Sequence, residues 1–132
     1  MRPTQAPTIR LSEYQQPAFW IKTVDLHFTL HPTATRVRST IEFSANDTRA
    51  DGLHDLHLHG QDLKLISASI NGTALKLDEI LIDAEGLTIP SDLIPQNGFT
   101  WEAEVEINPE ANTSLNGLYM SNGMYCTQCE AE

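Results

Sequence analysis

The last seven residues of this 132-residue chain hold its densest set of reactive side chains: Cys126, Gln128, Cys129, Glu130 and Glu132. On an extended segment, side chains two residues apart point the same way. A carboxylate in a cleft can accept charge-assisted hydrogen bonds from an ammonium group, and these are about twice as strong as neutral ones. Acidic side chains at a strand end are, however, more often solvated. The residues alone therefore leave an ammonium site and a solvated strand end both open.

Cys126 and Cys129 have the spacing of half a zinc ribbon or of a thioredoxin-type redox pair. The ribbon needs a second cysteine pair, and the chain has only two cysteines. The redox motif needs a helix amino terminus to stabilise the thiolate, whereas Thr127 and Gln128 follow an extended segment. Neither interpretation is favoured, and we expect reduced thiols rather than a disulfide framework.

Five histidines raise the question of a metal site. His27 and His31 have the spacing of a zincin motif, but on a predicted strand they lie about 13 Å apart, too far for one zinc ion. His57 and His59 would project from one strand face about 6.6 Å apart, close enough to chelate an ion, with His54 nearby. Because a complete ligand set is missing, the pattern favours surface histidines with incidental metal affinity.

The elements that would position these groups are strands, because apolar and polar residues alternate along most of the chain. In the first strand we expect Val24, Leu26, Phe28 and Leu30 to be buried. A second strand over residues 36–43 should pair with it as a hairpin. The remaining strands are predicted near residues 55–59, 63–70, 73–77, 80–89 as two short pieces, and 99–107, with a type I′ turn at Asn71-Gly72.

The strand over residues 99–107 carries three glutamates at alternate positions, Glu102, Glu104 and Glu106. Such a row resembles a cation site, but on a half-buried strand it is more often the solvated face. We therefore predict that these side chains face solvent.

No window of the chain repeats apolar residues at helical spacing, which predicts an all-β fold of two packed antiparallel sheets. Residues 1–16 are predicted to form a poorly ordered or surface arm, and residues 17–132 the β-sandwich domain. The net charge of −10 and the absence of a basic cluster argue against nucleic acid as a partner. Without a signal peptide or a membrane span, we expect a cytoplasmic protein.

The heptapeptide 126–132 resembles the Gln-x-Glu loop of the zinc aminopeptidases of the aminopeptidase N family (gluzincins), and most closely its bacterial branch. The run at residues 108–119 is also similar to that family, as are shorter stretches at residues 14–19, 24–26 and 62–65. The resemblance implies a saddle-like, amino-terminal β-sandwich domain, incomplete at its carboxyl end and followed in the parent enzyme by a catalytic domain.

The same resemblance assigns roles within a zinc metalloprotease of the membrane alanyl aminopeptidase type, which releases amino-terminal residues from peptides. It implies that Glu130 holds the free α-amino group of the peptide substrate and that Gln128 lines the pocket for its first side chain. The zinc ion and every catalytic residue would lie in the following domain, so this chain would be inactive alone. No catalytic or metal-binding residue is expected in it.

An alternative function, from another class of protein, remains open: the chain could be a stand-alone β-sandwich module that binds a ligand or a protein. Its acidic faces, or His57 and His59, would then form the binding surface. We further expect apolar surface near residues 118–125 to be exposed, which would let the chain form a homodimer.

Overall fold

The computed structural model describes residues 8–48 and 52–129, and these fold into short and long β-strands with three brief 3-10 helices. This confirms the all-β prediction. Within these ranges no helix has the length and apolar character needed to cross a membrane. The strands are β1 (Phe19–Thr29), β2 (Thr35–Ala45), β3 (Leu56–His59), β4 (Lys64–Ile70), β5 (Thr73–Ala74), β6 (Leu81–Ile82), β7 (Gly86–Ile89), β8 (Gly98–Ile107), β9 (Gly117–Ser121) and β10 (Met124–Gln128), and the 3-10 helices are η1 (Leu11–Glu13), η2 (Leu77–Glu79) and η3 (Ser91–Leu93).

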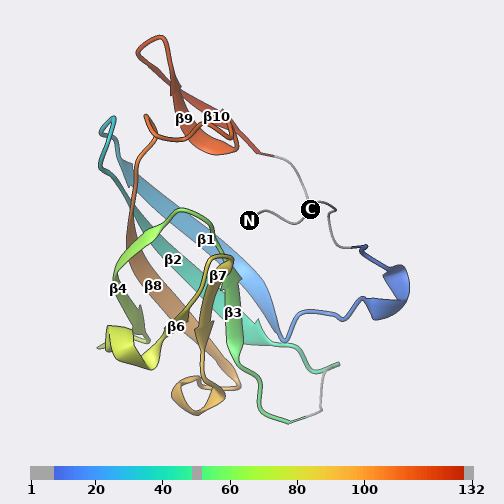
Figure 1. Cartoon of the computed structure of the whole chain (residues 1–132). Helices are drawn as coiled ribbons and strands as arrows, with labels where there is room; N and C mark the ends of the chain where they lie inside the picture. Colours follow the sequence, from blue (N-terminus) through green and yellow to red (C-terminus); the bar gives the residue numbers. More distant parts are fainter. Residues whose placement is uncertain (1–7, 49–51, 130–132) are drawn as a thin grey trace.

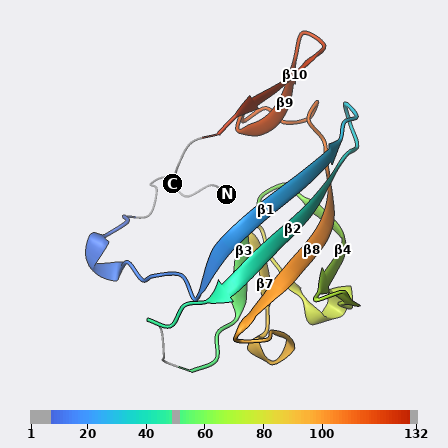
Figure 2. The same cartoon turned by 180° about the vertical axis from the view of Figure 1, so that it is seen from behind.

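Two antiparallel sheets form the body of the molecule. The larger has the strand order β1-β2-β8-β4-β5, and the smaller has the order β3-β7-β6. In both views the smaller sheet lies against one face of the larger one (Figures 1 and 2). Buried side chains from both sheets form a single core cluster, as in a β-sandwich.

The core lies where the two sheets overlap. Trp101 of β8 and Ile89 of β7 are almost completely buried, at 1% and 0% exposure. At one end of the core, the ring of Phe99 lies 4.9 Å from that of Phe43 and 5.3 Å from that of Phe19. The predicted inward face of residues 99–107 is thus confirmed at Phe99, Trp101 and Ala103.

The first predicted strand forms, but its expected burial is wrong. Val24, Leu26, Phe28 and Leu30 are between 46% and 54% exposed. β1 is an edge strand of the large sheet, and in the part of the chain that the structure describes no other sheet covers this end of the face. Alternation shows that a strand has an apolar face, but it does not show that a second layer lies over that face.

Two tight turns have the same backbone geometry. The predicted Asn71-Gly72 turn is confirmed, with φ of 51° and 81° at its central residues. Asn122-Gly123 has φ of 50° and 79° and joins β9 to β10. Both match a type I′ turn, which requires positive φ twice and so favours Asn-Gly. The strand after Asn71-Gly72 is shorter than predicted, because η2 begins at Leu77.

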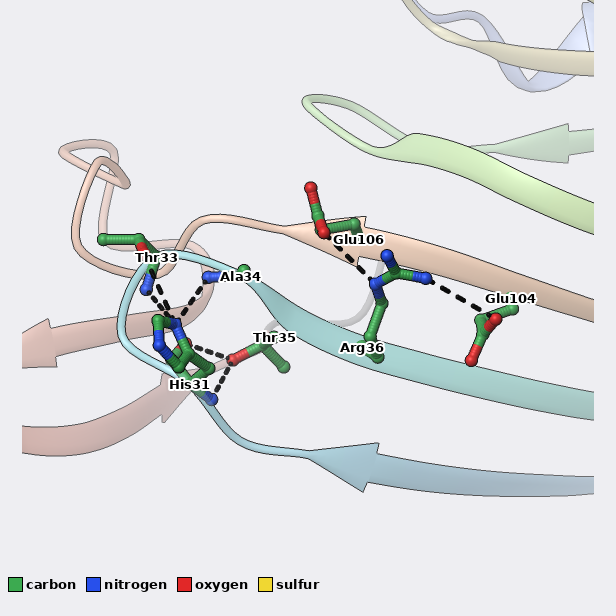
Figure 3. Close-up of polar contacts among 7 residues, drawn as sticks. All are labelled: His31, Thr33, Ala34, Thr35, Arg36, Glu104 and Glu106. Carbon is green, nitrogen blue, oxygen red and sulfur yellow. Dashed lines mark hydrogen bonds and ion pairs between the residues drawn. The ribbon is translucent and has the colours of Figure 1, made fainter.

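The outward face of the large sheet carries charges that pair across strands. Arg36 of β2 lies between two glutamates of β8: its Nε is 3.1 Å from Glu106 Oε1, and its Nη1 is 3.6 Å from Glu104 Oε2 (Figure 3). Glu102 is exposed on the same face. The glutamate row is therefore a solvated, partly paired surface, as predicted.

Candidate functional site

The residues singled out at the carboxyl end belong to a separate β-hairpin. Among residues 8–48 and 52–129, strands β9 and β10 pair only with each other, in a register that runs from Met124 opposite Ser121 to Gln128 opposite Gly117. The hairpin stands at one end of the sandwich (Figure 1). No residue of either strand is fully buried. The hairpin therefore presents its side chains rather than packing them into the core.

Gln128 is the last residue of β10, and its side chain is exposed. Cys129 follows it and is also exposed. Glu130 and Glu132 lie outside the described residues, so their predicted environment is not addressed by the structure. The roles assigned to Gln128 and Glu130 stay predictions, with Gln128 placed at an accessible strand end.

A cleft of about 560 Å³ separates the base of this hairpin from the sandwich. Cys129 and Asn112 line it from the hairpin side, and His59, Asp62 and Glu85 from the sandwich side. No lysine or arginine is among the described residues that line the cleft. Two carboxylates without a neighbouring cationic side chain favour a positively charged ligand.

Asn112 fixes the path of the chain into the hairpin. Its Nδ2 donates hydrogen bonds to the carbonyl oxygens of Asn116 (2.8 Å) and Leu118 (2.9 Å), and its Oδ1 accepts one from Ser114 Oγ (2.8 Å). Asn112 was not predicted from the sequence to be a positioning residue. The signal was present, because asparagine in a polar Asn-Thr-Ser stretch commonly bonds to nearby backbone.

The segment before Asn112 is tied to the sandwich at the turn between β1 and β2. The backbone N–H of Glu110 donates to the carbonyl oxygen of Pro32 at 2.9 Å, and the neighbouring Pro109 is fully buried. The hairpin is thus connected to the body through a buried proline and one backbone hydrogen bond. These contacts set the position from which β9 and β10 extend.

His31 holds that turn together (Figure 3). Its Nδ1 accepts hydrogen bonds from the backbone N–H groups of Thr33 (3.2 Å) and Ala34 (3.1 Å). The buried Thr35 donates from Oγ1 to the carbonyl oxygen of His31 at 2.6 Å. A ring nitrogen that accepts two backbone donors is occupied, so His31 has a structural role in the turn.

The other histidines and the cysteines do not assemble a metal site among residues 8–48 and 52–129. No group of three or more His, Cys, Asp or Glu side chains in these ranges could hold one ion. His57 Nδ1 instead lies 2.9 Å from Thr88 Oγ1. Cys126 and Cys129 are free thiols, and Cys126 lies within a strand rather than at a helix start. The geometry therefore lacks the helix that a thioredoxin-type pair requires.

Comparison with known proteins matches this chain to one group of enzymes. It is 42% identical over 133 residues to aminopeptidase N of Caulobacter vibrioides and 38% identical over 136 residues to aminopeptidase N of Escherichia coli. These alignments cover 100% and 98% of this chain but only 15% and 14% of those proteins. No protein-family model matches.

A comparison of the fold with solved structures also matches this chain to an aminopeptidase. The solved structure of Legionella pneumophila aminopeptidase A, determined in complex with aspartic acid, matches with a TM-score of 0.77 and 28% identity. That match covers 89% of this chain and 13% of the Legionella chain. Sequence and architecture thus agree: this chain matches part of bacterial aminopeptidase N, and its fold fits an amino-terminal β-sandwich domain of that enzyme.

Proposed function

We propose that this chain is the substrate-anchoring domain of a zinc-dependent aminopeptidase that removes amino-terminal residues from peptides. The observation that carries the proposal is the position of Gln128. It ends an exposed hairpin strand one residue before Cys129, which lines a cleft that contains Asp62 and Glu85 and, among the described residues, no lysine or arginine. Such a cleft favours the ammonium group of a peptide amino terminus.

In this proposal Glu130 accepts hydrogen bonds from the substrate's α-ammonium group. A carboxylate paired with an ammonium forms short, strong hydrogen bonds. Holding the amino terminus at a fixed point brings the first peptide bond, and no later one, to the reaction centre. Gln128, two residues earlier, lines the space for the first side chain. Exopeptidase specificity then follows from positioning.

The zinc ion of such an enzyme is proposed to bind in another domain of the longer protein. The described residues of this chain do not fit a zinc site, since they provide no cluster of three suitable ligands. The chain spans about 15% of the length of the Caulobacter relative. We therefore expect the isolated chain, with or without added zinc, to release no amino acid from peptide substrates, and measurable hydrolysis would contradict this assignment.

The anchoring role is tested by Glu130→Ala in the longer enzyme. Losing one partner of a charge-assisted contact costs about 2 kcal/mol, which is roughly a 30-fold fall in kcat/KM for peptides with a free amino terminus. The control is Glu110→Ala, because Glu110 is an exposed glutamate that precedes the hairpin. Unchanged kinetics in Glu130→Ala would remove Glu130 from the site.

A second candidate function, a stand-alone binding module, is favoured by one observation, the exposed apolar face of β1. The two functions differ in what the encoding reading frame contains. Continuation past Glu132 into a His-Glu-x-x-His segment supports the peptidase domain. A natural stop codon there would support the binding module.

A further inference from the structure

One side-chain amide binds the strand that pairs with Gln128. The Nδ2 of Asn112 donates to two carbonyl oxygens, those of Asn116 (2.8 Å) and Leu118 (2.9 Å). These residues lie on either side of Gly117, and Gly117 is the residue of β9 that lies opposite Gln128 of β10. The Asn112 amide therefore holds the backbone on both sides of the position that pairs with Gln128.

The pairing pattern of the hairpin points one of these carbonyl groups toward Asn112. In an antiparallel pair, residues whose backbone N–H and C=O groups point at the partner strand alternate with residues whose groups point away. Ser121 and Met124 close the hairpin across a two-residue turn, so they form a pair of the first kind. Counting back along β9, Gly117 also points its backbone groups at β10. Leu118 points its carbonyl oxygen away from β10, toward Asn112.

Asn112 is held in turn by the body of the molecule. Its backbone N–H donates to the carbonyl oxygen of the fully buried Pro109 (3.2 Å). Between these two residues, Glu110 donates its N–H to Pro32 in the β1–β2 turn, and that turn lies beside this segment in both views (Figures 1 and 2). The Asn112 side chain therefore connects β9 to the sandwich.

The loop that Asn112 closes contains a residue in a strained conformation. Leu115 has a φ of 58°, in the left-handed region that bulky side chains rarely adopt. Ser114 Oγ donates to the Oδ1 of Asn112 (2.8 Å), so both polar atoms of the amide bind this loop. A strained backbone persists only where the surrounding contacts hold it, and it is frequent at functional sites. The bonds of Asn112 supply such contacts.

We infer that Asn112 is a positioning residue for the substrate contact. Its amide fixes Gly117 and its neighbours, and through the Gly117–Gln128 pair it sets where Gln128 and Glu130 meet the substrate. This inference rests on the function proposed for Gln128 and Glu130, and it adds a residue that acts on the substrate through them. Asn112 also lines the acidic cleft, so its test separates this indirect action from a direct contact with substrate.

The first test needs no substrate and measures hydrogen exchange of the 132-residue chain by mass spectrometry. Asn112→Ala removes the bonds to Asn116 and Leu118. We expect exchange in β9 and β10 to accelerate about 5-fold or more, the factor for one lost hydrogen bond, and exchange in β8 to stay unchanged. Thr113→Ala is the control, because Thr113 is the exposed neighbour of Asn112, and it should exchange as the parent chain does. Equal acceleration in both variants, or none in Asn112→Ala, would overturn the inference.

The second test measures kcat/KM of the longer enzyme for alanyl-alanine, a dipeptide with a free amino terminus. Asn112→Ala should lower kcat/KM about 5-fold, and Thr113→Ala should leave it unchanged. In a Glu130→Ala background, Asn112→Ala should change kcat/KM by less than about 2-fold, because the contact that Asn112 positions is then absent.

The outcomes separate this inference from the proposed function. If Asn112→Ala lowers kcat/KM equally with and without Glu130, Asn112 acts directly or through stability, and the inference is overturned. It is also overturned if Asn112→Ala has no effect on kcat/KM while Glu130→Ala does. If Glu130→Ala has no effect, the proposed function fails, and the hydrogen-exchange result still decides whether Asn112 positions Gln128.

Discussion

The sandwich body and the β9–β10 hairpin differ in the interactions that stabilise them. The body buries side chains from both sheets around Trp101 and Ile89. The hairpin has no fully buried residue, and it is held by its own ladder, by Asn112, and by the bond from Glu110 to Pro32. Yet the candidate site belongs to the hairpin. The buried core that stabilises the fold and the proposed substrate contact are therefore in different parts of the chain.

This difference means that substitutions in the two regions should affect different measurements. Changes in the body should lower the free energy of unfolding of the whole domain. Changes in the hairpin should open that hairpin locally, because regions with few buried contacts open at a free energy well below the global value.

The largest effect is expected for Trp101→Ala. Removing a fully buried aromatic side chain leaves a cavity and costs about 3–5 kcal/mol in free energy of unfolding. Urea denaturation measures this change. The matched position is Tyr125→Ala on the hairpin, where the side chain is 37% exposed and we expect a loss below about 1 kcal/mol. Similar losses at both positions would show that the hairpin is part of the core.

An intermediate effect is expected at the two Asn-Gly turns. Gly72→Ala and Gly123→Ala both force a side chain into positive φ, at 81° and 79°, and each should cost about 1–2 kcal/mol locally. The Asn71-Gly72 turn is bonded to β8 through Thr100, so its loss should lower global stability. For Gly123→Ala, hydrogen exchange should accelerate only at β9 and β10. Equal changes in melting temperature would contradict the separation of the two regions.

The smallest effect is expected for Arg36→Ala on the outer face of the sheet. Its two ion pairs with Glu104 and Glu106 involve partly exposed side chains, so the loss should stay below about 1 kcal/mol. High salt screens such pairs, and the difference from the parent chain in urea denaturation should then shrink. A large, salt-independent loss would show that Arg36 stabilises the sheet by packing.

Much of the sandwich could be predicted from the sequence, because alternation reports which side chains share a face of a strand. Residues 99–107 and the turn at Asn71-Gly72 were placed correctly for this reason. Burial along β1 could not be predicted in the same way. Leu26 and Phe28 alternate as regularly as Phe99 and Trp101, but which part of a face receives a second layer depends on the topology of the whole sheet.

The candidate site, too, could be predicted only in part from the sequence. The Asn122-Gly123 turn carried the same signal as Asn71-Gly72, yet the hairpin was not predicted, because the flanking residues do not alternate clearly in polarity. The polar stretch around Asn112 indicated a bond to nearby backbone, but the identity of its partners, the carbonyl oxygens of Asn116 and Leu118, depends on the folded turn. Gln128 was singled out because residues 126–132 resemble the Gln-x-Glu loop of the aminopeptidase N family. The acidic cleft lined by the next residue, Cys129, depends on side chains distant in sequence, such as Asp62 and Glu85.

The proposed contact between Glu130 and the ammonium group of the substrate can be tested with a thermodynamic cycle that removes each partner in turn. Two inhibitors of the longer enzyme, alaninamide and its des-amino analogue propionamide, would be measured with the parent enzyme and with Glu130→Ala. We predict that alaninamide binds about 30-fold more weakly to Glu130→Ala, the equivalent of about 2 kcal/mol, while propionamide binds equally to both. An equal loss of affinity for the two inhibitors would contradict the ammonium contact.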